Sequence, residues 1–307
     1  MMSRISRIFS AMGTQNVKSS IRFHDLKPAL LDELFACLSS SRIPHPPFNK
    51  NSVAIFSEGI DALGILSNIF GNTLDAPPSF HDMLLWRLPD VWPWIAALNP
   101  LTGNLAEGDA SSGEIPRCSL YADGRIEMSL MHRMMVIIMF LGPFIANPRG
   151  GLVLAVIPDA AEDLLGLIAH EAPPCDLMPS MHHRLLFVFS ELLQHKDPTV
   201  ARHFRTAMET FDDRYPGKLL LTTAGRLTWF YRAEFEDREN FGLVEGYARL
   251  FNSEFLSRPR TIENLRQSTE NPIMSISGHI FQAPLMGRGQ LEWWQVWLLT
   301  SFMLYLF

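Results

Sequence analysis

The sequence predicts an all-α protein, an armadillo- or HEAT-like stack of helices (an α-solenoid) with little or no β-sheet. Apolar residues recur at helical spacing in most segments. Predicted helix starts near residues 158, 197 and 240 are separated by about forty residues, which is the length of such repeats. Strand patterns are scarce: KLLLTT at 218–223 has suitable residues but does not alternate. Repeat units of this kind stack because none can bury its apolar face alone.

Two helices are expected before residue 80. Their apolar faces are traced by Leu26, Leu30, Leu34 and Leu38, and then by Ile60, Leu63, Ser67 and Phe70. The intervening SSSRIPHPPFNKNS, 39–52, is rich in serine and proline and predicts a surface loop.

The segment LLWRLPDVWPWIAAL, 84–98, predicts a corner between two helices. The first is expected to end at Leu88, because a residue before proline avoids helical geometry. The second is expected to begin with Asp90 as N-cap and Pro93 in the first turn, where proline breaks no hydrogen bond. The indoles are expected to fill the joint, and a ligand-binding aromatic box is the alternative: Trp86, Trp92 and Trp94.

After this corner the sequence predicts a flexible loop at about 99–119, which is rich in Gly, Ser and Asp. MMVIIMFLGPFIA, 134–146, has 13 uncharged residues, too few for a membrane span of about 20, and predicts a buried helix. Further helices are expected in PDAAEDLLGLIAHE, PSMHHRLLFVFSELLQHKD, DPTVARHFRTAMETF (with Asp197 as N-cap) and NFGLVEGYARLFNSEFL.

Three regions are predicted. Residues 1–24 form a disordered basic tail, for which a mitochondrial transit peptide is the alternative. Residues 25–290 form the helical-repeat domain. Residues 291–307 form an apolar helix, and its uncharged run 293–307 suits either a core helix or a short membrane anchor.

Composition narrows the partners and the compartment. The net charge is −6 and no dense Lys/Arg run occurs, which argues against nucleic acid as a partner. The three cysteines, Cys37, Cys118 and Cys175, make neither a disulfide framework nor a metal-ligand spacing, and no N-glycosylation sequon occurs. We therefore expect an intracellular protein of the cytoplasm or nucleus, with the mitochondrion or a membrane as alternatives.

One cluster could carry metal chemistry: His170, Glu171, Cys175, His182 and His183. HEAPP lacks the second histidine of H-E-x-x-H, and adjacent histidines on a helix point about 100° apart. We therefore predict no catalytic, cofactor-binding or metal-binding residue. A metal-dependent enzyme around His170–His183 is the least favoured hypothesis.

The tryptophan segment 84–98, a polar loop, and the apolar helices of 134–168 together resemble the helical region of a large group of functionally uncharacterised proteins from mushroom-forming fungi. The resemblance spans about residues 50–260 and implies armadillo-like helices. Many of those proteins carry a C-terminal MYND-type zinc finger. No cysteine follows Cys175 here, so the resemblance implies a member that is truncated or lacks the finger, with no zinc ligands to carry over.

Taken together, the sequence predicts a non-catalytic intracellular scaffold whose partners are proteins, because stacked helices offer extended binding surfaces. The alternative is a protein attached to a membrane by residues 293–307.

Overall fold

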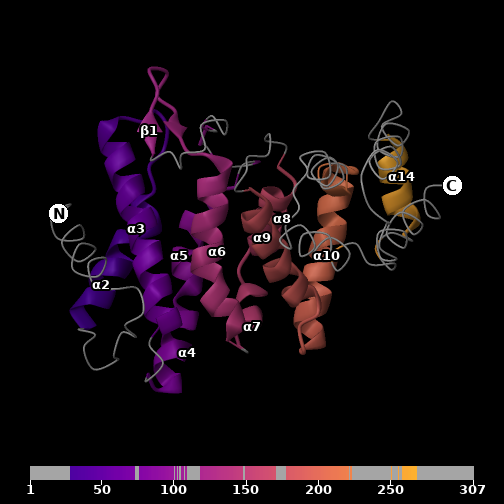
Figure 1. Ribbon diagram of the computed structural model, residues 1–307, viewed down its shortest axis with the longest axis horizontal. Helices are drawn as coiled ribbons and strands as arrows, with labels where there is room; N and C mark the ends of the chain where they lie inside the picture. Colours follow the sequence, from indigo (N-terminus) through magenta and orange to yellow (C-terminus); the bar gives the residue numbers. More distant parts are fainter. Residues whose placement is uncertain are drawn as a thin grey trace, which may run out of the picture. The chain divides into compact units, whose positions relative to one another are not determined.

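The part of the chain that the structure describes is mostly helical, as the sequence predicts, and contains one small β-hairpin (Figure 1). The computed structural model describes residues 28–72, 76–99, 101, 103, 105–106, 108, 118–147, 149–170, 178–220, 222, 250, 255 and 258–267. The predicted tail 1–24 and the apolar helix 291–307 lie outside these residues, as does most of the predicted loop 99–119. The chain divides into two compact units, with the boundary after Asp163.

Unit 1 contains α2 (Pro28–Cys37), the 3₁₀ turn η2 (Ser40–Arg42), α3 (Lys50–Asn72), α4 (Pro78–Trp86), α5 (Leu88–Ala96), β1 (Ser119–Leu120), β2 (Ile126–Glu127), α6 (Leu130–Ala146) and α7 (Gly150–Leu154). The boundary falls within α8 (Ala160–Ile168). Unit 2 contains α9 (Met178–Leu193), α10 (Pro198–Arg214) and α14 (Pro259–Gln267).

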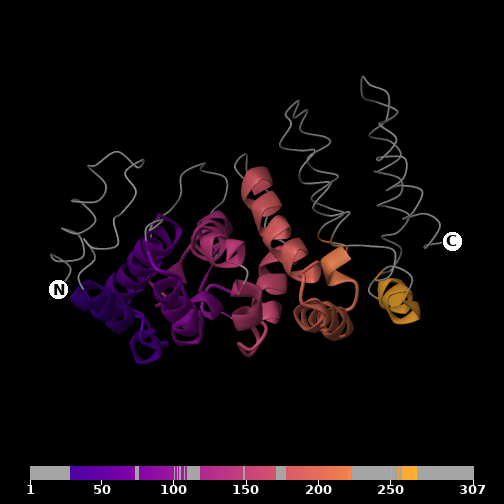
Figure 2. The same cartoon turned by 90° about the horizontal axis from the view of Figure 1, so that it is seen from below.

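The core of unit 1 is built on α3 and α6, which lie side by side (Figures 1 and 2). Pro143, inside α6, has no N–H for the carbonyl of Met139 four residues earlier. The hydroxyl of Ser67 on α3 donates a hydrogen bond to that carbonyl. Gly71 leaves room for the proline ring, which an added Cβ would approach to 3.1 Å. Pro143 would weaken α6 in isolation, and Ser67 and Gly71 of α3 accommodate it.

The predicted helix over 134–146 is confirmed: α6 includes this segment and buries most of its side chains. Among the described residues, one helix is long and apolar enough to cross a membrane, over Lys50–Gly71 of α3. Half of its most apolar stretch is buried inside the protein, and a single helix of this kind is weak evidence for a span.

The predicted corner exists, but its residues play different parts. α4 ends at Trp86 rather than Leu88, and α5 begins at Leu88 with Pro89 in its first turn. The N-cap is Arg87, and Asp90 lies in the first turn, where its carboxylate accepts a bond from Arg87 Nε at 2.7 Å. Pro89 can occupy the first turn because the N–H it lacks would have no partner there. Pro93 consequently lies inside α5.

The hairpin is the main element that the sequence analysis missed. Ser119 pairs with Glu127 and Leu120 with Ile126, in antiparallel register. Gly124 closes the turn with φ +76°, a conformation open to glycine. Ala106 adds a bridge to Glu127. The Asp-Gly pair before Ile126 is a known hairpin signal and would have revealed it.

In unit 2 the predictions for α10 hold. Asp197 is the N-cap, and its side chain accepts from the Thr199 N–H at 2.8 Å. The predicted apolar face is buried at Val200, Phe204, Met208 and Phe211. Phe204 meets Phe189 of α9 edge to face at 5.8 Å, and this contact packs the two helices together.

Three other segments considered in the sequence, at 158–168, 218–223 and 240–256, have different outcomes. α8 begins at Ala160, so Pro158 precedes the helix instead of opening it; Asp159 between them has φ 60° and interrupts the helical path. Lys218–Leu220, the start of the apolar run KLLLTT, has helical backbone. Of the helix expected at 240–256, only Leu250 and Phe255 are described, and both are helical and buried.

Candidate functional site

The histidine cluster of the sequence analysis lies mostly outside the described residues. His170 follows the end of α8, while Glu171, Cys175 and the side chains of His182 and His183 are not described. Among the residues that the structure describes, no group of three or more His, Cys, Asp or Glu side chains could hold a metal ion. Metal chemistry around His170–His183 therefore stays an untested hypothesis.

Cys118 lies beside Ser57 of α3, to which its thiol is hydrogen-bonded. Burial raises the pKa of this thiol to about 11. The thiol therefore stays protonated near neutral pH, which makes it a poor nucleophile.

Two of the three corner tryptophans fill the interior of unit 1. Trp94 is 1% exposed, packs against Phe56 at 5.6 Å between ring centroids, and donates from Nε1 to the carbonyl of Ser39 at 3.3 Å. A Cβ at Gly59 would lie 2.3 Å from the Trp94 ring, so glycine is the residue that admits the indole. Trp92 is also buried. The prediction that indoles fill the joint is thus confirmed for these two.

Asp163 is a buried carboxylate that binds this corner. Its Oδ2 accepts from Trp92 Nε1 and its Oδ1 from Asn99 Nδ2, both at 2.8 Å. Burial raises the pKa of Asp163 above its ordinary value, although both hydrogen bonds act in the opposite direction. Its place in the first turn of α8 also favours the charged form, because the N-terminal end of a helix is positively polarised. Asp163 therefore acts as a hydrogen-bond acceptor for side chains inside the protein.

Trp86 contradicts the prediction, because 72% of its surface is exposed. The reason is its position on α4: Phe80 and Leu84 mark the buried side, and Trp86 lies two residues, about 200°, beyond Leu84. The three indoles therefore do not gather into one aromatic box.

Trp86 belongs to a set of exposed apolar side chains on two helices that pack together, α4 and α7. We call this set the α4–α7 surface: Met83 (37% exposed), Trp86, Leu152 (42%) and Val156 (70%), the last of these in the turn after α7. Arg149 Nη1 and Asp82 Oδ2 join the two helices at 2.5 Å. Leu152 lies three residues after Arg149, on the same face of α7, and Val156 follows the end of the helix.

The region of the α4–α7 surface also carries paired charges, on α4, at the start of α5 and at the N-cap of α7. Asp82 pairs with Arg149, and Arg87 pairs with Asp90 at 2.7 Å. Arg87 also lies over the ring of Phe35, 4.0 Å from its centroid. The four charges balance, so the ion pairs of these helices add no net charge to the exposed apolar side chains. Isolated exposed apolar residues are common, but a set shared by two contacting helices is a feature of binding surfaces.

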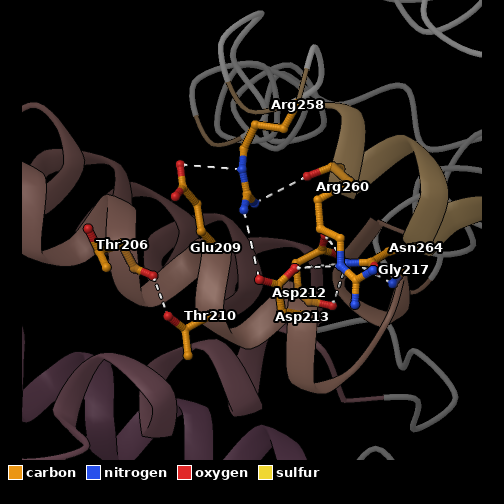
Figure 3. Close-up of polar contacts among 10 residues, drawn as sticks. Thr206, Glu209, Thr210, Asp212, Asp213, Gly217, Arg258, Arg260 and Asn264 are labelled. Atoms are coloured by element: carbon orange, nitrogen blue, oxygen red, sulfur yellow. Dashed lines mark hydrogen bonds and ion pairs between the residues drawn. The ribbon is translucent and has the colours of Figure 1, made fainter.

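Unit 2 holds a second polar centre, where α10 meets α14 (Figure 3). Asn264 Nδ2 donates to Asp212 O and Oδ2, each at 3.0 Å, and to Asp213 Oδ1 at 3.2 Å. The Gly217 N–H donates to Asp212 Oδ1 at 3.3 Å. Burial raises the pKa of Asp212, against the lowering effect of these bonds. The centre joins two helices and brings no open set of reactive groups together.

Comparison of the chain with protein-family models, with curated proteins and with solved structures found no significant match.

Proposed function

We propose that the protein is a non-catalytic intracellular scaffold that binds other proteins, with its helices stacked in the armadillo-like manner that the repeat spacing and the fungal resemblance suggest. The observation that carries this proposal is the α4–α7 surface. An exposed tryptophan is the residue type most often found at the energetic centre of protein interfaces. The same two packed helices carry three more exposed aliphatic or thioether side chains.

The charge pattern favours one kind of partner, a protein segment with an apolar face, such as an amphipathic helix. Balanced ion pairs offer no net field to attract a strongly charged ligand, whereas removing the exposed apolar side chains from water lowers the free energy. Binding of this kind should depend little on salt. Docking to nucleic acid would instead require a cluster of positive charges and would weaken steeply as the salt concentration rises.

The test places a photo-crosslinking residue at position 152, on the α4–α7 surface, in the full chain expressed in its own cells. The matched control carries the same residue at position 187, an exposed phenylalanine of α9 (48% exposed). We expect a discrete protein adduct at 152 that is absent at 187. That protein, once purified, should bind the chain saturably, with an affinity that changes little between low and high salt. Identical adducts at both positions would contradict the proposal.

A further inference from the structure

The charges at the junction of α10 and α14 oppose the dipole of each helix taken alone. The C-terminal end of a helix is negatively polarised, and the last turn of α10 contains Asp212 and Asp213 beside a single cation, Arg214. The N-terminal end is positively polarised, yet Arg258 precedes α14 and Arg260 lies in its first turn, which holds no acidic residue. Each helix end therefore carries charges that disfavour it in isolation.

The two unfavourable ends meet and neutralise each other (Figure 3). Arg258 Nε lies 3.6 Å from Glu209 Oε1, and Arg258 Nη2 lies 4.0 Å from Asp213 Oδ2. Arg260 Nε lies 3.6 Å from Asp213 Oδ1. These contacts join α10 to a helix that begins 45 residues after α10 ends, from Arg214 to Pro259.

We propose that these residues form an electrostatic clasp that couples the folding of α14 to its docking on α10 and makes both sensitive to ionic strength. Without α10, the arginines oppose the dipole of α14; against α10, the same arginines have acidic partners. The partners are partly exposed, so salt reaches them: the screening length falls from about 10 Å at 0.1 M to about 3 Å at 1 M. The clasp thus lets solution conditions set how firmly α14 is held. It lies in unit 2 and is independent of the proposed binding function.

Hydrogen–deuterium exchange of residues 259–267 in the full chain tests the clasp. At low salt, Asp213→Arg or Arg260→Asp should each speed exchange of α14 by up to roughly fivefold, because each reversal replaces an ion pair across the junction with like charges, and a partly exposed pair supports no larger factor. Asp213→Asn, which keeps an acceptor for Asn264, should have a smaller effect. In 1 M salt these differences should shrink.

The double variant Asp213→Arg with Arg260→Asp gives the sharpest outcome. It restores the opposite charges and places a cation at the C-terminus of α10 and an anion at the N-terminus of α14, where both dipoles favour them. We therefore expect α14 to exchange as slowly as in the unchanged chain, or more slowly. The control Arg202→Glu, an exposed reversal near the other end of α10, should leave exchange unchanged. Exchange in the double variant as fast as in the single variants, or single variants without effect, would overturn the proposal.

Discussion

Two joints of this protein bring together residues that are distant in the sequence, and they do so by opposite means. Trp94 reaches Ser39, 55 residues away, from within an apolar interior of aromatic rings. Asn264 reaches Asp212, 52 residues away, through hydrogen bonds and nearby ion pairs. The first joint is stabilised by filled volume and the second by paired polar groups. Substitutions should therefore weaken them for different reasons and by different amounts.

The largest effect is expected at the apolar joint. Trp94→Ala should lower the free energy of unfolding by about 3–5 kcal/mol, because the surrounding helices cannot close the cavity left by a fully buried indole. Urea unfolding followed by circular dichroism measures this change. A loss below about 1 kcal/mol would mean that Trp94 does not fill the joint as the contacts with Phe56 and Gly59 indicate.

A single substitution at the polar joint should lower the free energy of unfolding by less than the loss of Trp94. Asn264→Ala removes the amide that donates to Asp212 and leaves that buried carboxylate with fewer partners. We expect a loss of about 1–3 kcal/mol, the usual cost of a buried polar group without its partner. Thr210→Ala is the matched control, an exposed residue of α10 in the same view (Figure 3), and should change stability by less than about 0.5 kcal/mol. Equal effects of the two substitutions would contradict the role of Asn264.

A third expectation concerns pH at the tryptophan corner. Because burial raises the pKa of Asp163 above its ordinary value of 3.8, the folded chain holds this proton more tightly than the unfolded chain. The contribution of Asp163 to stability is therefore greatest below pH 3.8 and is lost as the pH rises through the raised pKa.

Asp163→Asn cannot titrate, so the stability of the unchanged chain relative to this variant should decline over that pH range. Urea unfolding at several pH values measures it. Asp32→Asn, at an exposed carboxylate of α2, is the control. A difference that stays constant with pH would exclude a titrating Asp163.

The contrast between the joints also explains what the sequence could predict. Apolar periodicity and capping chemistry are local in the sequence. The buried face of α10, its N-cap Asp197 and the helix over 134–146 could therefore be predicted from the sequence. The polar joint depends on Asn264 lying beside Asp212, which no local pattern encodes. The same holds for Ser67, whose hydroxyl donates a hydrogen bond to the carbonyl of Met139, 72 residues away.

Only part of the α4–α7 surface could be predicted from the sequence. Trp86 could have been assigned to the solvent side of α4, because it lies opposite Leu84 on the helix. The grouping with Leu152 and Val156 could not be predicted, because it depends on the packing of α7 on α4. The stacking of the repeats and the resemblance to the fungal proteins stay predictions, and a membrane anchor at 293–307 stays the alternative.

The smallest effect on stability, and the most informative result on function, is expected from Trp86→Lys. The exposed indole ends α4, where a cation suits the helix dipole, so the free energy of unfolding should change by less than about 0.5 kcal/mol. The direct measurement is photo-crosslinking from position 152 in this variant, with its melting temperature recorded alongside. We expect an unchanged melting temperature and loss of the adduct. An adduct of undiminished yield in a stably folded variant would contradict the claim that this surface binds a protein partner.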